Sequence, residues 1–461
     1  MDQSIVFDPA LIAKYDQTGP RYTSYPTAVE FNEQFTVADY HAACLRGNAT
    51  QRPLSLYIHI PFCDTVCFYC ACNKIATKDR SLSKPYLNRL CREMELHNAV
   101  LDTNRQIIQL HWGGGTPTFI HHNEMRQLWN AIRNNFKVAN DDIGEYAIEI
   151  DPREANIDTI NLLRELGFNR MSLGIQDFNP QVQQAVNRIQ SEKQTLEVLK
   201  AAKQARFRSI SFDLIYGLPF QTADSFAITI DKVIALAPNR LSLFNYAHLP
   251  QMFPPQRRID ATSLPSSTVK LEILNTSIEK LIQAGYVFIG MDHFAHPHDE
   301  LAIAQREGTL YRNFQGYSTH ANCDLIGLGV TSIGITDNTY SQNHKTLEAY
   351  YSAIDANQLP IWRGITLTLD DQIRRAVISQ LICHFHLHFQ TIETHWNINF
   401  WNYFQDTLPA LNSMQMDGLL SIDDFGIQVQ PKGRLLIRNI CMLFDAYLAK
   451  KTAITKFSKV I

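Results

Sequence analysis

The chain contains Tyr57-Ile58-His59-Ile60-Pro61-Phe62-Cys63-Asp64-Thr65-Val66-Cys67-Phe68-Tyr69-Cys70, in which the end of a predicted strand is followed at once by three closely spaced cysteines. The spacing C-x-x-x-C-x-x-C gathers three thiolates in one loop. Iron–sulfur clusters normally have four cysteine ligands, so three ligands leave one iron open to a small molecule. An open coordination position is typical of a catalytic metal centre. We therefore predict Cys63, Cys67 and Cys70 as ligands of a catalytic iron–sulfur cluster.

A structural zinc site is the alternative interpretation of this loop. Zinc takes four protein ligands, commonly as two separated pairs, and no second pair of cysteines follows in the sequence. Cys72 would add only a crowded C-x-C thiolate. The other cysteines are scattered, and the total of 9 is odd, which does not suggest a secreted disulfide framework; they are Cys44, Cys91, Cys323, Cys383 and Cys441.

Strands and helices alternate on both sides of this loop. This pattern indicates a parallel sheet with helices outside it, and its repetition predicts an α/β fold with an open partial (β/α)6 barrel. The predicted strands are Leu54–Ile60, Ile107–Trp112, Glu145–Asp151, Arg170–Gln176, Ser209–Ile215 and Arg240–Tyr246. The predicted helices are Pro85–Leu101, Asn123–Phe136, Asp158–Leu166, a helical stretch ending at Ala205, and Thr222–Leu236.

Side chains of one parity are polar along several of these strands. Alternate residues of a strand share a face, so the polar set should line the inside of the barrel, with its largest groups near the active-site end. The alternative is a mixed sheet of six amphipathic strands. The polar set comprises Ser55, Tyr57, His59, Glu149, Asp151, Ser172, Gly174, Gln176, Ser209, Ser211 and Asp213.

The remaining segments suggest three domains. We expect an N-terminal extension over the active site (1–50), the barrel with its extension (51–365) and a mainly helical C-terminal domain (366–461). Further expected elements are a helix at Val269–Ala284, a strand at Gly285–Met291, a helix at Asp299–Glu307, a Gly-interrupted strand at Leu325–Ile335, a hairpin at Gly418–Arg438 and a helix at Ile440–Lys450. A DNA-binding winged helix is a less favoured interpretation of the last region.

Charge and hydropathy narrow the class of protein. The chain has 461 residues, with 42 basic and 45 acidic side chains and a net charge of −3. This balance does not favour binding to nucleic acid or to acidic lipid. Met1–Ala10 lacks the features of a signal peptide, and no apolar run reaches the ~20 residues that span a bilayer. We expect a cytoplasmic protein.

Glycines and histidines provide weaker signals. The run Trp112-Gly113-Gly114-Gly115-Thr116-Pro117 follows the second strand, where glycine lets backbone approach a ligand closely; a tight turn would explain the same letters. His384 and His388 have the spacing of a metal pair on one helix face. His293, His296 and His298 lie near Asp292 and Asp299 and could bind metal or substrate. Ordinary structural roles are the simpler interpretation of both histidine groups.

Several motifs together resemble the oxygen-independent coproporphyrinogen III oxidases (coproporphyrinogen dehydrogenases) of the radical S-adenosylmethionine superfamily. The resemblance runs nearly end to end. Its motifs include Gly19-Pro20-Arg21-Tyr22-Thr23-Ser24-Tyr25-Pro26-Thr27, the cysteine loop through Cys72-Asn73-Lys74, His111-Trp112-Gly113-Gly114-Gly115-Thr116-Pro117-Thr118, Glu149-Ile150-Asp151-Pro152-Arg153-Glu154, Asp213-Leu214-Ile215-Tyr216-Gly217-Leu218-Pro219 and Arg312-Asn313-Phe314-Gln315-Gly316-Tyr317.

This resemblance implies one 4Fe–4S cluster and two molecules of S-adenosylmethionine. It implies catalytic roles for Cys72 and Gln315. Contacts to the first S-adenosylmethionine would come from Tyr57, Gly114, Glu149 and Ile333, and contacts to the second from Tyr69, Gly115, Thr116, Gln176, Arg188, Asp213 and Ala247. Tyr69 and Ala71 replace the usual Phe and Gly of the family. Tyrosine can still stack on adenine, and Ala71 is acceptable only if its φ is not positive.

The implied reaction begins when the reduced cluster gives one electron to S-adenosylmethionine, releasing methionine and a 5′-deoxyadenosyl radical. The radical takes hydrogen from a propionate, and loss of an electron and carbon dioxide leaves a vinyl group. Two rounds of this reaction convert coproporphyrinogen III to protoporphyrinogen IX. The resemblance also implies that the protein is a monomer. Its electrons would come from a low-potential donor of flavodoxin or ferredoxin type. Haem chaperones of the same superfamily are the alternative, but they usually lack Cys72-Asn73-Lys74 and the N-terminal motif.

Two of the implied site residues have simpler explanations. Arg188 and Asp213 could pair with each other, or together satisfy a bound zwitterion. Cys72 could be a buried small hydrophobe, or it could act near the substrate.

Overall fold

The computed structural model describes residues 4–449, which fall into two units. The larger unit comprises Phe31–Ser266 and Asn322–Thr366. The smaller unit is drawn from Met1–Glu30, Ser267–Ala321 and Leu367–Ile461. The domain boundaries predicted from the sequence remain predictions.

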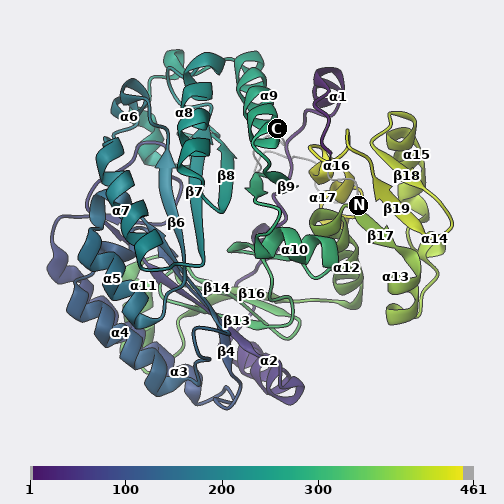
Figure 1. Ribbon diagram of the computed structural model, residues 1–461. Helices are drawn as coiled ribbons and strands as arrows, with labels where there is room; N and C mark the ends of the chain where they lie inside the picture. The colour runs from purple at the N-terminus through teal and green to yellow at the C-terminus, as the bar shows by residue number, and fades with distance from the viewer. Residues whose placement is uncertain (1–3, 450–461) are drawn as a thin grey trace. The chain divides into compact units, whose positions relative to one another are not determined.

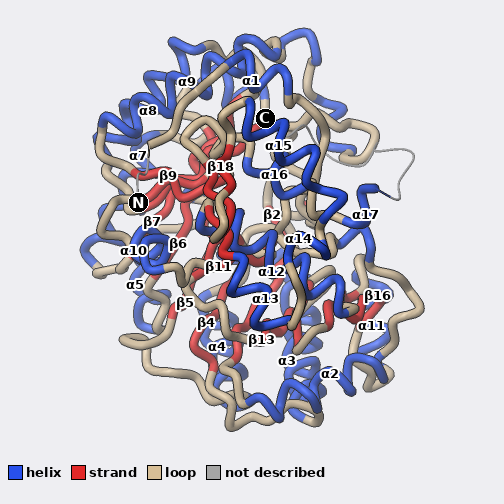
Figure 2. The backbone as a smooth tube through the Cα atoms, turned by 90° about the vertical axis from the view of Figure 1, so that its right-hand side faces the viewer, coloured by secondary structure: helices blue, strands red, loops and turns tan. Residues whose placement is uncertain are grey.

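A twisted sheet forms the centre of the larger unit. Its strands β1 (Leu54–Ile60), β4 (Ile107–Gly114), β5 (Glu145–Ile150), β6 (Arg170–Gln176), β7 (Ser209–Tyr216) and β8 (Arg240–Asn245) are parallel and pair in chain order. Strands β4 to β7 run side by side in Figure 2. This arrangement confirms the predicted α/β fold and the order of its six parallel strands.

Helices form an outer layer along these strands (Figure 1). They are α3 (Ser83–Asn98), α4 (His122–Asn135), α5 (Ile157–Leu166), α6 (Pro180–Ala185), α7 (Glu192–Gln204) and α8 (Ala223–Leu236). Local signals fix their ends: Thr222 caps the first turn of α8 in a capping box, which satisfies free N–H groups. Gly167 ends α5 in the left-handed region, with φ +107°.

The core between sheet and helices is aromatic around β4. The Trp112 side chain is fully buried, and its ring lies edge-on to Phe168, with centroids 4.9 Å apart. Trp129 of α4 packs against the same Phe168 ring. The apolar side chains of β4 therefore face the helices, and the alternate side chains of this strand face the opposite side of the sheet.

Four more strands extend the sheet beyond β1. Strand β13 (Asp324–Leu328) pairs parallel with β1, and β14 (Ile333–Thr336), β15 (Thr339–Asn343) and β16 (Ile361–Thr366) follow as an antiparallel set. The single strand predicted over Leu325–Ile335 is therefore wrong. The chain reverses near Gly329, whose φ is +93°, so that Leu325 pairs with Ile335.

Two α-helices precede the first strand. Helix α1 (Pro9–Lys14) belongs to the smaller unit, and α2 (Val37–Thr50) belongs to the larger one.

The remainder of the smaller unit is mainly helical. It includes α9 (Ser267–Gln283), the β9–β10 hairpin (Val287–Gly290 and His293–Ala295), α10 (Glu300–Glu307), a second hairpin formed by β11 (Tyr311–Asn313) and β12 (Gly316–Ser318), α12 (Leu369–His384), α13 (Phe389–Trp396) and α15 (Leu408–Met416). The predicted C-terminal helix is two short ones, α16 (Ile437–Met442) and α17 (Ala446–Ala449); Lys450 lies outside the described residues.

The C-terminal hairpin is part of a three-stranded sheet. The predicted pair is β18 (Leu420–Ile422) and β19 (Gly426–Val429), and β17 (His386–His388) adds a third strand. Helix α12 ends at His384, because Phe385 adopts φ 58°. His384 and His388 therefore do not share a helix face, so the less favoured alternative of a metal pair on one helix face is wrong.

Candidate functional site

The cysteine loop begins where β1 ends. Cys63 lies in the short strand β2 (Phe62–Cys63), which pairs with β3 (Ile75–Ala76) and closes the loop at its base. Backbone hydrogen bonds fix its interior, from Cys70 N to Cys67 O at 3.2 Å and from Phe68 N to Val186 O at 2.9 Å. Cys63 and Cys67 are buried, and Cys70 is half-buried. The loop is therefore held in place by protein contacts on both sides.

The donor set suits an iron–sulfur cluster better than a single metal ion. Within residues 4–449, no three His, Cys, Asp or Glu side chains are arranged to hold one ion. Cysteines that bind a cluster each ligate a different iron, so their sulfurs need not converge. Two of the sulfurs already accept hydrogen bonds, Cys63 from Thr116 Oγ1 at 3.4 Å and Cys67 from Arg153 Nη2 at 3.5 Å.

The glycine run lets β4 pack tightly against this loop. A Cβ on Gly115 would lie 2.7 Å from the Phe62 carbonyl oxygen. A Cβ on Gly113 would lie 2.8 Å from Glu149 Oε1. Gly114 has φ +116°, a conformation that other residues rarely adopt. These glycines are therefore required by the protein's own packing, in addition to any ligand.

Glu149 is held from two sides. Its Oε1 lies 3.0 Å from His111 Nε2, and its Oε2 accepts a hydrogen bond from Gly114 N at 3.2 Å. Burial opposes ionisation, but these two partners, the His111 side chain first, bring the pKa of Glu149 below its ordinary value. The side chain is still 45% exposed, so an ionised carboxylate lines an accessible space.

Two consecutive hydrogen bonds connect the side chains of β1 to the segment that carries Cys72. His59 Nε2 lies 3.1 Å from the carbonyl oxygen of Asn73, so this nitrogen bears the proton. The other ring nitrogen, Nδ1, then accepts from the Tyr57 hydroxyl at 3.1 Å. Burial also lowers the pKa of His59, which favours this neutral form. The alternation of polar residues found His59 but not His111, which lies opposite Tyr57 on β4.

Arg188 and Asp213 do not pair with each other, so the alternative of an ion pair between these two residues is wrong. Arg188 Nη1 lies 2.8 Å from Asp151 Oδ2. Asp213 Oδ2 instead accepts from Ser172 Oγ at 2.6 Å. Burial, with repulsion from Glu149 as a further cause, raises the pKa of Asp213 to about 6.

Arg188 also has an unused donor. The residue is 5% exposed, and its Nε has no hydrogen-bond partner among residues 4–449. A buried donor without a partner is costly, so a bound anion or carboxylate would complete its surroundings. Gly174 makes room here: a Cβ on it would lie 2.9 Å from Arg188 Nη2 and 2.8 Å from Gln176 Nε2.

Tyr69 and Ala247 are brought together by one glutamine. Gln256 Nε2 donates to the Tyr69 carbonyl at 3.1 Å and to the Ala247 carbonyl at 3.2 Å. The Tyr69 side chain packs against an apolar group that contains Val182, Val186, Leu218, Tyr246 and Ile259. Ala71 is not among the residues with positive φ, so the replacement of glycine there requires no strained backbone.

Three other predicted residues occupy distinct positions. Ile333 begins β14, and its backbone packs directly on Gly327. Cys72 is exposed, so the alternative of a buried packing residue is wrong. Gln315 lies in the smaller unit between β11 and β12, where its backbone N–H donates to Asn313 Oδ1 at 2.9 Å and its buried Nε2 has no partner among the described residues. The role of Gln315 remains a prediction.

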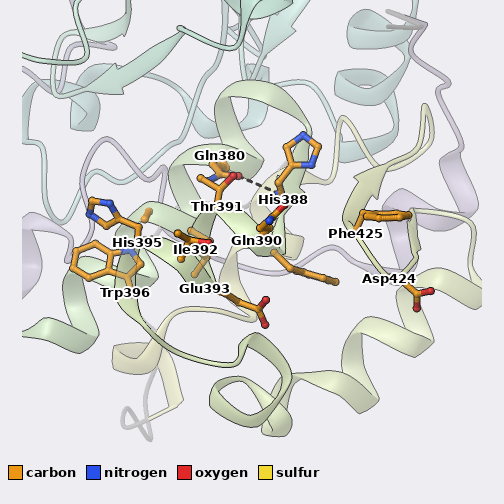
Figure 3. A pocket seen from close by; sticks show the side chains of 13 residues that line it. Gln380, His388, Gln390, Thr391, Ile392, Glu393, His395, Trp396, Asp424 and Phe425 are labelled. Carbon is orange, nitrogen blue, oxygen red and sulfur yellow. Dashed lines mark hydrogen bonds between the residues drawn. The ribbon is translucent and has the colours of Figure 1, made fainter.

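His296 and His388 have different surroundings. The His296 ring lies against Tyr286 in a tilted arrangement, with ring centroids 4.4 Å apart, and Asp299 caps α10. His388 lines a surface pocket of about 920 Å³ beside α13, together with Trp396 and Phe425 (Figure 3). His384 does not line it, which again separates the two histidines. None of the described helices is long and apolar enough to cross a bilayer.

Comparison with known proteins adds independent information. Residues 57–233 match the Radical SAM superfamily, and residues 367–436 match the HemN C-terminal domain. Two curated proteins named oxygen-independent coproporphyrinogen III oxidase align over 100% of this chain. The protein of Pseudomonas aeruginosa is 54% identical and covered in full, and that of Escherichia coli K12 is 50% identical and covered to 99%.

A solved structure gives the same result. It is described as coproporphyrinogen III oxidase (HemN) from Escherichia coli, a radical SAM enzyme. The match has a TM-score of 0.92 at 49% identity and covers 96% of this chain and 100% of that chain.

Proposed function

Because this chain belongs to the oxygen-independent coproporphyrinogen III oxidase family of radical SAM enzymes, we propose how its own residues divide the work of the reaction. That reaction is the oxidative decarboxylation of two propionate side chains of coproporphyrinogen III to vinyl groups, which yields protoporphyrinogen IX. The relatives that match over the whole chain are named as oxidases, and this does not support the haem-chaperone alternative.

One observation in the structure supports this proposal most strongly. The cysteine loop, the glycine run and Glu149 meet where β1, β4 and β5 end, the edge at which βα folds carry active sites. Cys63, Cys67 and Cys70 would hold a 4Fe–4S cluster with one iron open. When bound, this cluster supplies the electron that cleaves S-adenosylmethionine to methionine and a 5′-deoxyadenosyl radical.

The residues around the loop bind and orient the first S-adenosylmethionine. Glu149 is ionised and accessible, so it can accept hydrogen bonds from the amino group of the methionine part. Tyr57 is fixed by its hydrogen bond to His59 and presents an aromatic ring at the same edge. Gly114 and Ile333 complete this set as backbone neighbours.

A second S-adenosylmethionine would bind on the other side of the loop. The free Nε of Arg188 suits the carboxylate of such a molecule. Asp213 and Gln176 lie on neighbouring strands beside it. Tyr69, Gly115, Thr116 and Ala247 would supply the remaining contacts, with Tyr69 able to stack on adenine.

Cys72 has the position expected of a group that moves a hydrogen or a proton. It is exposed, and its thiol hydrogen bonds with Cys70. If Cys72 were itself a fourth ligand of the cluster, it would occupy the iron that must stay open for S-adenosylmethionine. The low-potential electron donor, a monomeric state and a cytoplasmic location belong to the same proposal.

Anaerobic assay tests this function directly. Purified protein should contain about four irons per chain. With a strong reductant, S-adenosylmethionine and coproporphyrinogen III, it should release carbon dioxide from the porphyrinogen together with 5′-deoxyadenosine from S-adenosylmethionine. Cys63→Ala, Cys67→Ala and Cys70→Ala should each lose most of the iron. Stoichiometric zinc in place of iron, or tight haem binding without decarboxylation, would contradict the proposal.

A further inference from the structure

Two guanidinium groups approach one cysteine of the loop. Arg153 Nη2 lies 3.5 Å from Cys67 Sγ, and Arg188 Nη1 lies 3.6 Å from the same atom. Cys70 has a cationic neighbour, Lys74, whose ammonium donates to the Cys70 carbonyl at 3.3 Å and also hydrogen bonds with the Cys70 side chain. Cys67 is therefore the cysteine of the loop that is approached by two guanidinium groups.

Asp151 holds both arginines in place. Its carboxylate accepts from Arg153 Nε at 3.0 Å and from Arg153 Nη2 at 2.7 Å, in the two-pronged geometry that fixes a guanidinium plane. The same carboxylate accepts from Arg188 Nη1 at 2.8 Å. One carboxylate shared by two guanidinium groups leaves one net positive charge beside Cys67.

This charge lies in a poorly solvated place. The exposed fractions of the side chains are 9% for Asp151, 15% for Arg153 and 7% for Arg188. Charges act more strongly where water is excluded. Hydrogen bonds and charges near the sulfurs of an iron–sulfur cluster set its reduction potential.

We propose that Arg153, oriented by Asp151, raises the reduction potential of the cluster by donating to Cys67 and by bringing positive charge to it. Arg153 is a positioning and tuning residue in this role, and it needs no contact with either S-adenosylmethionine. One-electron reduction adds negative charge to the cluster, and the guanidinium stabilises that reduced state more than the oxidised one. A weaker physiological reductant can then supply the electron.

The test is a potentiometric titration of the reconstituted holoenzyme, followed by the electron paramagnetic resonance of the reduced cluster. In Arg153→Gln we expect iron and sulfide contents to be retained and the reduction equilibrium to become at least about tenfold less favourable, a shift of about 59 mV to more negative potential. Arg153→Lys keeps the charge but loses the fork, so its potential should lie between those of Arg153→Gln and the wild type.

The control is Arg164→Gln, which removes an arginine of α5 paired with Asp141 at 2.6 Å and not in contact with the loop. Its potential should equal that of the wild type. An unchanged potential in Arg153→Gln, or an equal shift in Arg164→Gln, overturns the inference. Loss of iron in both Arg153→Gln and Arg153→Lys would show a structural role and would also overturn it.

The inference rests on the proposed function, since it requires the cluster. The experiment distinguishes failure of the proposed function from failure of this inference. A wild-type protein that contains no iron contradicts the proposed function. A wild-type protein that holds the cluster, with a reduction potential that does not change in Arg153→Gln, contradicts only the inference.

Discussion

His111 Nε2 lies 3.0 Å from Glu149 Oε1, on the strand next to it in the sheet. The His111 ring also stacks on Tyr57, with centroids 5.8 Å apart. One histidine therefore supports two residues that we assign to the first S-adenosylmethionine, although it is not itself assigned to a ligand. It connects the strand order of the sheet to the orientation of the site.

Loss of this histidine should weaken binding of S-adenosylmethionine without loss of iron. In His111→Ala, Glu149 loses the largest of the influences that lower its pKa. Its pKa should rise, so the acid limb of binding should move to higher pH. We expect affinity to fall about tenfold at neutral pH, the usual effect of one hydrogen bond to a charged group. Equilibrium dialysis of the reconstituted protein from pH 4 to pH 8 measures both effects.

His122→Ala is the matched control for that experiment. His122 Nε2 lies 3.0 Å from Thr159 Oγ1 at the helix layer, away from the cysteine loop. Its loss should leave the pH dependence of binding unchanged. A His111→Ala protein with wild-type affinity at every pH would contradict the positioning role.

Asp213→Asn should weaken binding of S-adenosylmethionine but stabilise the fold above neutral pH. The folded-state pKa of Asp213, about 6, lies above its ordinary value of 3.8, so the protein binds this proton more tightly when folded. The contribution of Asp213 to the free energy of unfolding is therefore largest at low pH, and it is lost as the pH rises through about 6. Removal of the buried charge should therefore add about 1–3 kcal/mol at pH 8 and almost nothing at pH 4. Thermal unfolding at both pH values measures it.

A surface carboxylate provides the comparison for Asp213. Asp355 pairs with Arg89 at 2.7 Å, and this partner lowers the pKa of Asp355. Asp355→Asn should give no gain in stability at pH 8 and no change in binding. If Asp213→Asn stabilised the protein and bound S-adenosylmethionine like the wild type, a purely structural role for this carboxyl would follow.

Much of the fold could be predicted because local signals agree with one another. The bounds of β1 and β6 are those predicted, and Thr222 and Asp299 mark helix starts that the structure confirms as caps. The reversal at Gly329 escaped prediction because the Gly-interrupted apolar pattern of Leu325–Ile335 fits one strand as well as two. A chain reversal there depends on pairing with β1, which periodicity does not report.

Side-chain partners were harder to predict than strands. The family resemblance was sufficient to assign Arg188 and Asp213 to one site, but not to show that Asp151 is the partner of Arg188. That choice depends on register and on side-chain rotamers. The glycine run was predicted as a ligand cradle, whereas its packing against Phe62 and Glu149 depends on how closely β4 approaches β1 and β5.

Gly115→Ala should displace the cysteine loop. The added methyl group would meet backbone atoms of Pro61 and Phe62 at 2.7–2.8 Å, and backbone cannot move aside as a flexible side chain can. We expect most of the iron to be lost on anaerobic purification, while the far-ultraviolet circular dichroism of the fold persists.

Gly308→Ala is the control glycine variant. Gly308 has φ +72°, and a Cβ there would meet nothing within 4 Å. It should cost about 1 kcal/mol in backbone strain and leave iron content unchanged. Full iron occupancy in Gly115→Ala would show that the loop tolerates the displacement.

Cys72→Ser should keep the cluster and lose most of the decarboxylation. Cys72 lies two residues after Cys70 and is exposed, unlike the buried Cys63 and Cys67. The chain also fixes its neighbour, since the Asn73 carbonyl is bound by His59 and the Asn73 amide donates to the Lys345 carbonyl at 2.9 Å. A segment held this firmly beside an exposed thiol suits hydrogen or proton transfer. Serine preserves size and the hydrogen bond but is a far weaker acid and hydrogen donor than a thiol.

The measurements that decide this prediction are iron content and carbon dioxide release by the same preparation. Cys91→Ser, on helix α3, is the control and should retain both. Iron loss in Cys72→Ser comparable to that in Cys63→Ala would identify Cys72 as a fourth ligand, because a missing ligand destabilises the whole cluster. Full decarboxylation with full iron would show that its thiol takes no part in the reaction, and the hydrogen or proton would then have to come from another group or from solvent.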